Sequence, residues 1–307
     1  MANDTPPVVP EISKTTPDAA GRRALHEGNR LSWNEATRAH NSHKRDQAKF
    51  FREGGNKLFE EERAILGDVS GLSVLHLQCN SGQDTLSIKQ LGAAKVTGVD
   101  ISDEAIGFAR KLSADSGLEA TFHRADVYDW LAEAAKREDR WDIVYCSYGA
   151  IIWLSDLETW ARGITAVLKP GGRFVTIEFH PVAWMFSDDF EHKLPYSTRG
   201  KAMTWSDGIS DYVAEAGKGA ITPSGWEDGV QNFQNPHPAH EFAWGLSEVV
   251  QPLINAGLVL EKLQEYYHLG GIHPFKCMVR EAERRWVLPP DVPSVPLMYS
   301  IVARKPA

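Results

Sequence analysis

The stretch of sequence that decides the fold is VLHLQCNSG, residues 74–82. Its apolar part is typical of a buried strand, and the small residues at its end predict a tight loop before a helix that begins at Gln83. A second apolar segment, residues 96–99, ends at Asp100, eighteen positions after Gly82. A loop at a helix start presents backbone N–H groups, and an acid after the next strand is placed to hold a ribose. The spacing therefore predicts a nucleotide-binding βαβ unit.

The chain beyond this unit keeps alternating between strand and helix patterns. The helix at residues 156–168 is the clearest, because its apolar residues recur at helical spacing and Pro170 follows them. Strands connected by helices predict a parallel sheet with right-handed crossovers. The later signals appear in this order: strand 120–124 with Ala125 and Asp126, strand 141–147, the segment LKPGG at 168–172, and strand 173–178.

This ordered series resembles the class I S-adenosylmethionine (SAM)-dependent methyltransferases. Their first loop reads E/D-x-G-x-G-x-G, and His76, Gln78, Asn80 and Gly82 fall on its four spaced positions. Only the last glycine is present, so the later signals carry most of the resemblance, which covers residues 70–180 in detail. The segments HLQC-x-x-G-x-D-T-L-S, SYGA-x-x-WL and EFHP look like a microbial small-molecule branch. The resemblance implies a Rossmann-like α/β fold whose seven-stranded sheet has the order 3-2-1-4-5-7-6 and is flanked by helices.

Five regions are expected along the 307 residues. Residues 1–22 are polar and Pro-rich, which predicts a disordered tail. Residues 23–66 have a helical pattern interrupted at Gly54-Gly55, and we interpret them as an N-terminal helical lid of two helices. Residues 67–179 are the SAM-binding α/β core. Residues 180–245 lack periodicity and are too long for a plain loop, which predicts an inserted substrate cap, and residues 246–307 return to the core.

The composition limits which binding partners and which cellular compartment we expect. The formal net charge is −8, and an acidic surface repels phosphate backbones, so nucleic-acid substrates are disfavoured. Three cysteines without a C-x-x-C pair favour a reducing compartment. No apolar run reaches membrane-spanning length. We therefore expect a cytoplasmic protein that binds a small molecule and neither nucleic acid nor membrane, and the oligomeric state stays open.

The resemblance implies SAM as the cofactor, S-adenosylhomocysteine as its product, and no metal ion. Asp100 is expected to accept hydrogen bonds from the ribose hydroxyls, and Asp126 from the adenine amino group. Asn at position 80 suits a loop that needs left-handed backbone angles. His76 sits where the family often has an acid, and we interpret it as a core histidine. The expected cofactor-binding residues are Gln78, Cys79, Asn80, Ser81, Gly82, Asp100, Ile101, Asp126, Val127 and Ser147.

The acceptor site is expected where the fourth and fifth core strands end, because these ends lie over the methyl group in this fold. They carry Tyr148 and His180, which are our expected catalytic residues. His180 is either a general base near neutral pH or a structural hydrogen-bonding residue at a strand end. Aromatic side chains in the lid and the cap suit an apolar acceptor pocket. The expected substrate-binding residues are Trp33, Tyr148, His180, Trp184 and Trp244.

The sequence therefore predicts an enzyme that transfers a methyl group from SAM to an O, N or S atom of a small aromatic or heterocyclic metabolite by in-line displacement. Two alternatives stay open: a methyltransferase that modifies a protein, and a non-catalytic regulator with the same fold. The D/N-P-P-Y/F motif of DNA and glutamine N-methyltransferases is absent after residues 141–147, as is the magnesium carboxylate of catechol-type enzymes. The absence of G-x-G-x-x-G disfavours an NAD-dependent oxidoreductase.

Overall fold

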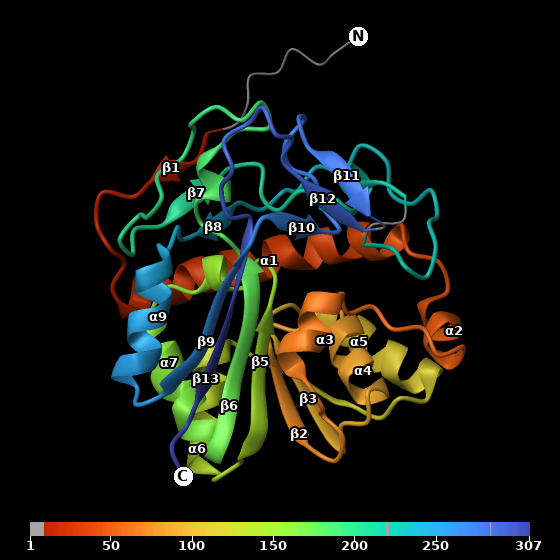
Figure 1. Cartoon of the computed structure of the whole chain (residues 1–307), viewed down its shortest axis with the longest axis vertical. Coiled ribbons are helices and arrows are strands. Elements are labelled where there is room, and N and C mark those ends of the chain that lie inside the picture. Colours follow the sequence, from red (N-terminus) through yellow and green to blue (C-terminus); the bar gives the residue numbers. More distant parts are fainter. Residues whose placement is uncertain (1–8, 219–220, 283) are drawn as a thin grey trace.

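The computed structural model describes residues 9–218, 221–282 and 284–307, and a mixed sheet lies at its centre (Figure 1). Its strands within those ranges are β2 (Ser73–Leu77), β3 (Lys95–Asp100), β4 (Thr121–Arg124), β5 (Trp141–Ser147), β6 (Leu168–Phe179), β9 (Val259–Tyr266) and β13 (Met298–Arg304). They are arranged in the order β4-β3-β2-β5-β6-β13-β9. β13 runs antiparallel to both of its neighbours, whereas β2 to β6 are parallel. The predicted order 3-2-1-4-5-7-6 is confirmed.

Helices cover both faces of this sheet (Figure 1). On one face lie α6 (Val127–Lys136), α7 (Leu157–Val167) and α9 (Leu246–Asn255), and on the other lie α3 (Glu60–Leu66), α4 (Gln83–Gln90) and α5 (Asp103–Ser116). The predicted helix at 156–168 is α7, which Asp156 caps by accepting the Thr159 N–H at 3.0 Å. Its apolar face buries Trp160 against Phe174 of β6, with ring centroids 5.2 Å apart. Burial of such faces on both sides of the sheet supplies the core.

The N-terminal region is more ordered than the sequence suggested. The part of the expected tail that the structure describes contains β1 (Glu11–Ile12), and the long helix α1 (Ala19–Ser42) begins within it. Asp18 caps α1 by accepting the Gly21 N–H at 2.8 Å, so the disordered-tail expectation is wrong for residues 9–22. Residues 1–8 lie outside the described residues.

The lid region contains three helices rather than the two expected. A second break at residues 43–46 separates α1 from α2 (Gln47–Arg52), and Asp46 caps α2 by accepting the Lys49 N–H. α1 crosses the end of the sheet at which the parallel strands finish (Figure 1). It therefore lies over the loops that follow β2, β3 and β5.

Two small antiparallel sheets lie beyond α1 (Figure 1). One has the order β1-β7-β8, with β7 (Met203–Trp205) and β8 (Ala239–Glu241) from the insert. The other has the order β10-β12-β11 and comes from the long connection between β9 and β13. Its strands are β10 (His268–Gly270), β11 (Val279–Ala282) and β12 (Arg285–Val287); the shorter helices are η1 (Ile151–Trp153), η2 (Ala183–Met185) and α8 (Tyr212–Ala216). None of the helices in the described ranges has the length and hydrophobicity to cross a membrane.

Candidate functional site

The loop after β2 adopts left-handed backbone angles at every second residue. φ is 53° at Gln78, 46° at Asn80 and 77° at Gly82. These are the three positions at which the class I loop has glycine, so the backbone shape is retained although two glycines are not. Each replacement makes a hydrogen bond of its own. The Gln78 amide donates to the Ala150 carbonyl at 2.7 Å, and the Asn80 Oδ1 accepts the Ser81 N–H at 2.6 Å.

A side chain at position 82 would clash with neighbouring residues. A Cβ at this position would lie 2.7 Å from Ala109 Cβ and 2.8 Å from Phe122 Cζ. α4 begins at the next residue, so this close contact sets the helix against α5 and β4. The first N–H groups of α4 consequently face the end of the sheet, where a helix favours a negative charge.

Asp100 ends β3 directly beside this loop. Its carboxylate accepts the Asn80 N–H at 2.8 Å and the Ser102 N–H at 2.9 Å. Burial raises the pKa of Asp100 to about 6, so the group is ionised at neutral pH. It is half-buried and retains lone pairs for further donors. The loop and the carboxylate therefore converge, as a ribose site requires.

Asp126 caps α6 by accepting the Tyr128 N–H at 2.9 Å, and its second oxygen meets α1. His26 Nδ1 lies 2.6 Å from that oxygen, and His26 Nε2 lies 2.8 Å from the Ser155 hydroxyl. The His26 ring also stacks on Tyr128 at 5.4 Å. The sequence reasoning missed His26, because a contact across 100 residues leaves no local pattern.

Polar contacts at helical spacing hold α1 over the site. Several of its arginines pair with acids at the starts of α5, α6 and α7, and Asn41 bonds the Ser81 hydroxyl at 2.8 Å. Each exposed ion pair stabilises the docked helix by only about 0–1 kcal/mol. The ion pairs are Arg22–Asp156, Arg23–Asp129, Arg30–Asp103 and Arg38–Glu104.

The other predicted cofactor residues line the same strand ends. Val127 is buried and Ile101 half-buried, next to the two acids. Cys79 is buried, and burial raises the pKa of its thiol well above the usual value, which suits a packed residue. Ser147 ends β5 with its hydroxyl 3.5 Å from His76 Nε2. Burial lowers the pKa of His76 to about 4, so it is a neutral core histidine.

Residues 74–172 match a family model described as a methyltransferase domain. Residues 74–172 are therefore a methyltransferase domain, as the resemblance to the class I SAM-dependent enzymes predicts. Among curated proteins it is 28% identical over 166 residues to the ubiquinone biosynthesis O-methyltransferase of Bordetella avium, covering 52% of this chain and 66% of that one. It is 32% identical over 130 residues to the demethylmenaquinone methyltransferase of Lactococcus lactis, covering 41% and 50%. The chain thus spans between half and two thirds of the length of these relatives.

Solved structures support the fold. A Listeria monocytogenes protein described as SAM-dependent methyltransferase superposes with a TM-score of 0.51 at 19% identity, covering 80% of this chain and 97% of that one. A SAM-dependent methyltransferase from Clostridium acetobutylicum gives 0.50 at 12% identity, covering 85% and 92%. At these identities the likeness concerns the fold alone.

A row of aromatic rings lies where the acceptor site is expected. Tyr148 follows β5 and contacts Phe59 at 5.8 Å and Phe179 at 5.6 Å between ring centroids, and Phe179 contacts Trp184 at 5.4 Å. Within the described residues, the Tyr148 hydroxyl and the Trp184 indole N–H are buried and have no hydrogen-bond partner. Buried donors are usually paired, so this row is a place where a ligand atom would be favourable.

The remaining predicted acceptor residues make their side-chain contacts with residues outside this row. His180 Nδ1 accepts the Val182 N–H at 3.2 Å, and its Nε2 then donates to Glu265 at 3.1 Å. Both ring nitrogens of His180 are thus engaged within the protein, at the end of the strand. Trp244 donates to the Leu154 carbonyl and packs beside α7 and α9, whereas Trp33 contacts Trp153 at 5.4 Å under α1.

Beneath the aromatic row lies a buried acid that the sequence reasoning missed. Glu62 of α3 is 1% exposed and accepts the Tyr145 hydroxyl at 2.5 Å and the Phe59 N–H at 2.7 Å. Burial raises the pKa of Glu62 to about 8. The fold therefore prefers the protonated acid.

This preference predicts a pH dependence of stability. The contribution of Glu62 is fully present below its unfolded pKa of about 4.3 and is lost as the pH rises toward 8. We expect the free energy of unfolding of the Glu62→Gln variant to fall less than that of the wild type between pH 5 and pH 8. Urea titrations at both pH values measure this change in the free energy of unfolding. The control is Glu60→Gln in the same helix turn, whose side chain is 90% exposed. Parallel pH profiles for wild type and Glu62→Gln would contradict the assignment.

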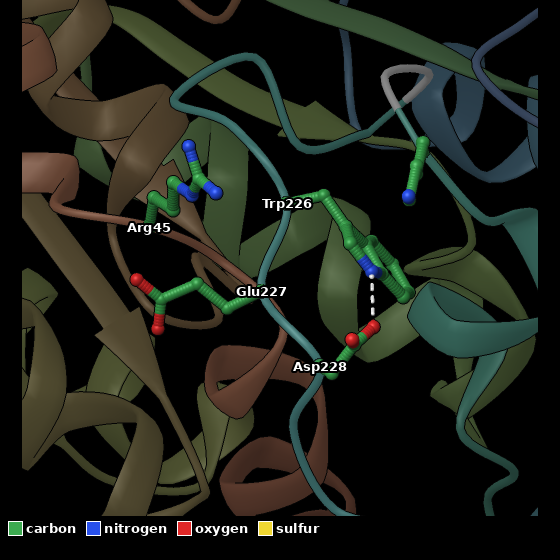
Figure 2. Close-up of a pocket in the computed structure, with 5 residues that line it drawn as sticks. Arg45, Trp226, Glu227 and Asp228 are labelled. Atoms are coloured by element: carbon green, nitrogen blue, oxygen red, sulfur yellow. Dashed lines mark hydrogen bonds between the residues drawn. The ribbon is translucent and has the colours of Figure 1, made fainter.

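A cavity of about 330 Å³ lies outside this site, between the α1–α2 loop and the insert. Figure 2 shows Arg45 and Glu227 on one side of the insert segment, and Trp226, which donates its indole N–H to Asp228, on the other. Lys44 pairs with Trp226 through the backbone, and the Trp226 ring stacks on His43 at 4.9 Å. The insert is thereby tied to the end of α1.

Proposed function

We propose that the protein transfers the methyl group of SAM to an O, N or S atom of a small aromatic or heterocyclic acceptor by in-line displacement. The observation that carries this proposal is the convergence of the left-handed loop 78–82 and the Asp100 carboxylate beneath α1. The methyltransferase domain supports the reaction, and the aromatic row supports the kind of acceptor.

The residues present fit SAM at three points. Asp100 has free lone pairs for ribose hydroxyls, Asp126 offers a carboxylate for the adenine amino group, and the start of α4 favours an anion. When bound, SAM supplies an electrophilic methyl group on a sulfonium. The protein's own task is then to align the acceptor atom with that methyl group and to exclude water.

The acceptor end is enclosed by the lid, the insert and the β10-β12-β11 sheet. Phe59, Tyr148, Phe179 and Trp184 present ring faces and edges there, which favour a flat ring. Two curated relatives are named for ubiquinone biosynthesis and for demethylmenaquinone. Hydroxylated aromatic rings and demethylmenaquinone are therefore the first acceptors to test.

Calorimetry and labelled methyl transfer test this function together. We expect SAM to bind and its labelled methyl group to enter the small-molecule fraction of a cell extract. Label in the macromolecular fraction would indicate a protein substrate, and tight SAM binding without transfer to any fraction would indicate a regulator. Absence of SAM binding at millimolar concentration by the folded protein would refute the proposal.

Replacing Tyr148 by phenylalanine separates ligand binding from stability. Because its hydroxyl has no partner within the described residues, its removal should leave the melting temperature unchanged. An acceptor atom bonded to it would lose about 1 kcal/mol, so kcat/KM for the acceptor should fall about fivefold. Tyr266→Phe is the control, because its hydroxyl already pairs with Ser300 at 3.0 Å. Equal kcat/KM values for wild type and Tyr148→Phe would remove Tyr148 from the acceptor site.

A further inference from the structure

One face of α1 turns toward the end of the sheet, and it carries a buried histidine with a free nitrogen. His40 is 2% exposed, and its Nε2 lies 2.9 Å from the Ser210 carbonyl. A carbonyl only accepts, so Nε2 bears the hydrogen and Nδ1 is left with a bare lone pair. Burial lowers the pKa of His40 to about 4, which keeps the ring neutral. Nδ1 has no hydrogen-bond partner anywhere in the described ranges.

Lys44 follows four residues later, just beyond the end of α1 at Ser42, and is half-buried. Its ammonium has no ion pair or hydrogen bond with the part of the chain that the structure describes. Two acids are close enough for their charges to act on Lys44, and both are already paired. Asp84 pairs with Lys57 at 2.9 Å, and Asp211 pairs with His43 at 2.8 Å. An ammonium partly removed from water without a counter-charge is unfavourable, which points to an anion from outside the chain.

The position of Lys44 is fixed over the cofactor loop. On one side of it, Asn41 bonds the Ser81 hydroxyl at 2.8 Å. On the other side, Gln47 accepts the Gln83 amide at 2.7 Å. Lys44 is thus held above the start of the eight-residue helix α4, whose first N–H groups also favour an anion.

We propose that Lys44 and His40 bind the α-amino-acid end of SAM, with the Lys44 ammonium holding the carboxylate and His40 Nδ1 accepting an N–H from the amino group. The inference rests on the proposed function and adds a residue pair to it. His40 and Lys44 are four positions apart at the end of α1 and offer an acceptor and a cation, as a group that carries both charges on one carbon requires. The end of α1, and not only the loop after β2, then selects SAM over nucleosides that lack the amino acid.

Calorimetry with two ligands tests the pair. S-adenosylhomocysteine has the amino-acid end, whereas 5′-methylthioadenosine lacks it. We expect Lys44→Met to weaken S-adenosylhomocysteine about 30-fold and to leave 5′-methylthioadenosine unchanged, because a hydrogen-bonded charge pair is lost for one ligand alone. His40→Leu should act in the same direction. Arg45→Met is the matched control, because Arg45 is the neighbouring cation and lines the outer cavity (Figure 2).

The outcomes separate this inference from the function on which it rests. Retained binding of 5′-methylthioadenosine shows that a variant is folded. Equal weakening of both ligands, or unchanged S-adenosylhomocysteine binding in Lys44→Met, would overturn the amino-acid site while the methyltransferase function stands. A wild-type protein that binds neither ligand would overturn both.

The pH dependence gives an independent readout. Burial lowers the pKa of Lys44 to about 7, and the groups that face it are Lys57 and Asp84 below, Asp211 and Tyr212 in the insert, and His40 and His43 beside it. A carboxylate needs the charged ammonium, so above pH 7 binding must take up a proton. Between pH 7 and 8.5 the affinity for S-adenosylhomocysteine should fall up to about tenfold per pH unit in the wild type. The same profile in Lys44→Met, or none in the wild type, would count against the site.

Discussion

Replacing Gly82 by alanine is expected to destabilise the protein by about 3 kcal/mol and to abolish cofactor binding. At φ 77° an alanine costs about 1–2 kcal/mol relative to glycine. The new Cβ would also lie 2.7 Å from Ala109 Cβ and 2.8 Å from Phe122 Cζ, and such overpacking costs about 1–3 kcal/mol. Relief of the contact must move α4 away from α5, which displaces the N–H groups at the start of α4.

Urea denaturation of Gly82→Ala and Gly117→Ala isolates the steric part of this effect. Gly117 has a similar φ of 74° at the end of α5, and a Cβ there would meet nothing within 4 Å. Gly117→Ala should therefore lose only the backbone part, about 1–2 kcal/mol. If the two variants lost the same stability, the close contact at Gly82 would not be what holds the helix in place.

Replacing Asp100 by alanine is expected to weaken SAM binding about 100-fold. Two hydrogen bonds from ribose hydroxyls to a carboxylate contribute about 1.5–3 kcal/mol each, and one of them alone accounts for more than tenfold. The variant also leaves the Asn80 and Ser102 N–H groups without their acceptor, which loosens the loop. Calorimetry with S-adenosylhomocysteine measures the loss, with Asp129→Ala as the control for an acid paired only at the surface.

A ligand without ribose hydroxyls distinguishes the direct contact from the loosened loop. The wild type should prefer S-adenosylhomocysteine over its 2′,3′-dideoxy analogue, and Asp100→Ala should bind both equally, because the contact is absent in either case. The wild-type preference should also shrink below pH 6, where the Asp100 carboxyl becomes protonated. A preference that survives in Asp100→Ala would place the ribose elsewhere.

The sheet was predictable because its signals are local. A buried parallel strand appears in the sequence as a continuous apolar run. A helix such as α7 appears as apolar residues at helical spacing, with Pro170 shortly after its end. α1 was partly missed because its start at Ala19 follows a polar, Pro-rich stretch and depends on the Asp18 cap and on distant acids. The insert has little periodicity because short strands such as β7 pair only with β1 and β8.

The part of the candidate site that the strand ends form was predictable, whereas the part that α1 forms was not. Asp100 and the loop residues follow strands, so their position is given by the strand ends. His26 meets Asp126 across 100 residues, and His40 and Lys44 have their neighbours in distant segments, so nothing near them in the chain marks these positions. Once α1 is known to run from Ala19 to Ser42, the helical spacing places His26, Trp33, Thr37 and His40 on one face, with Lys44 just beyond the end of the helix.

Gln78 gives the cofactor loop a property that a glycine there would lack. Its amide ties the loop after β2 to the Ala150 carbonyl, beyond the end of β5 and next to Tyr148. In the proposed reaction, a shift of the loop around the cofactor would be transmitted through this one side chain to the segment after β5. A glycine at position 78 would leave the two segments uncoupled.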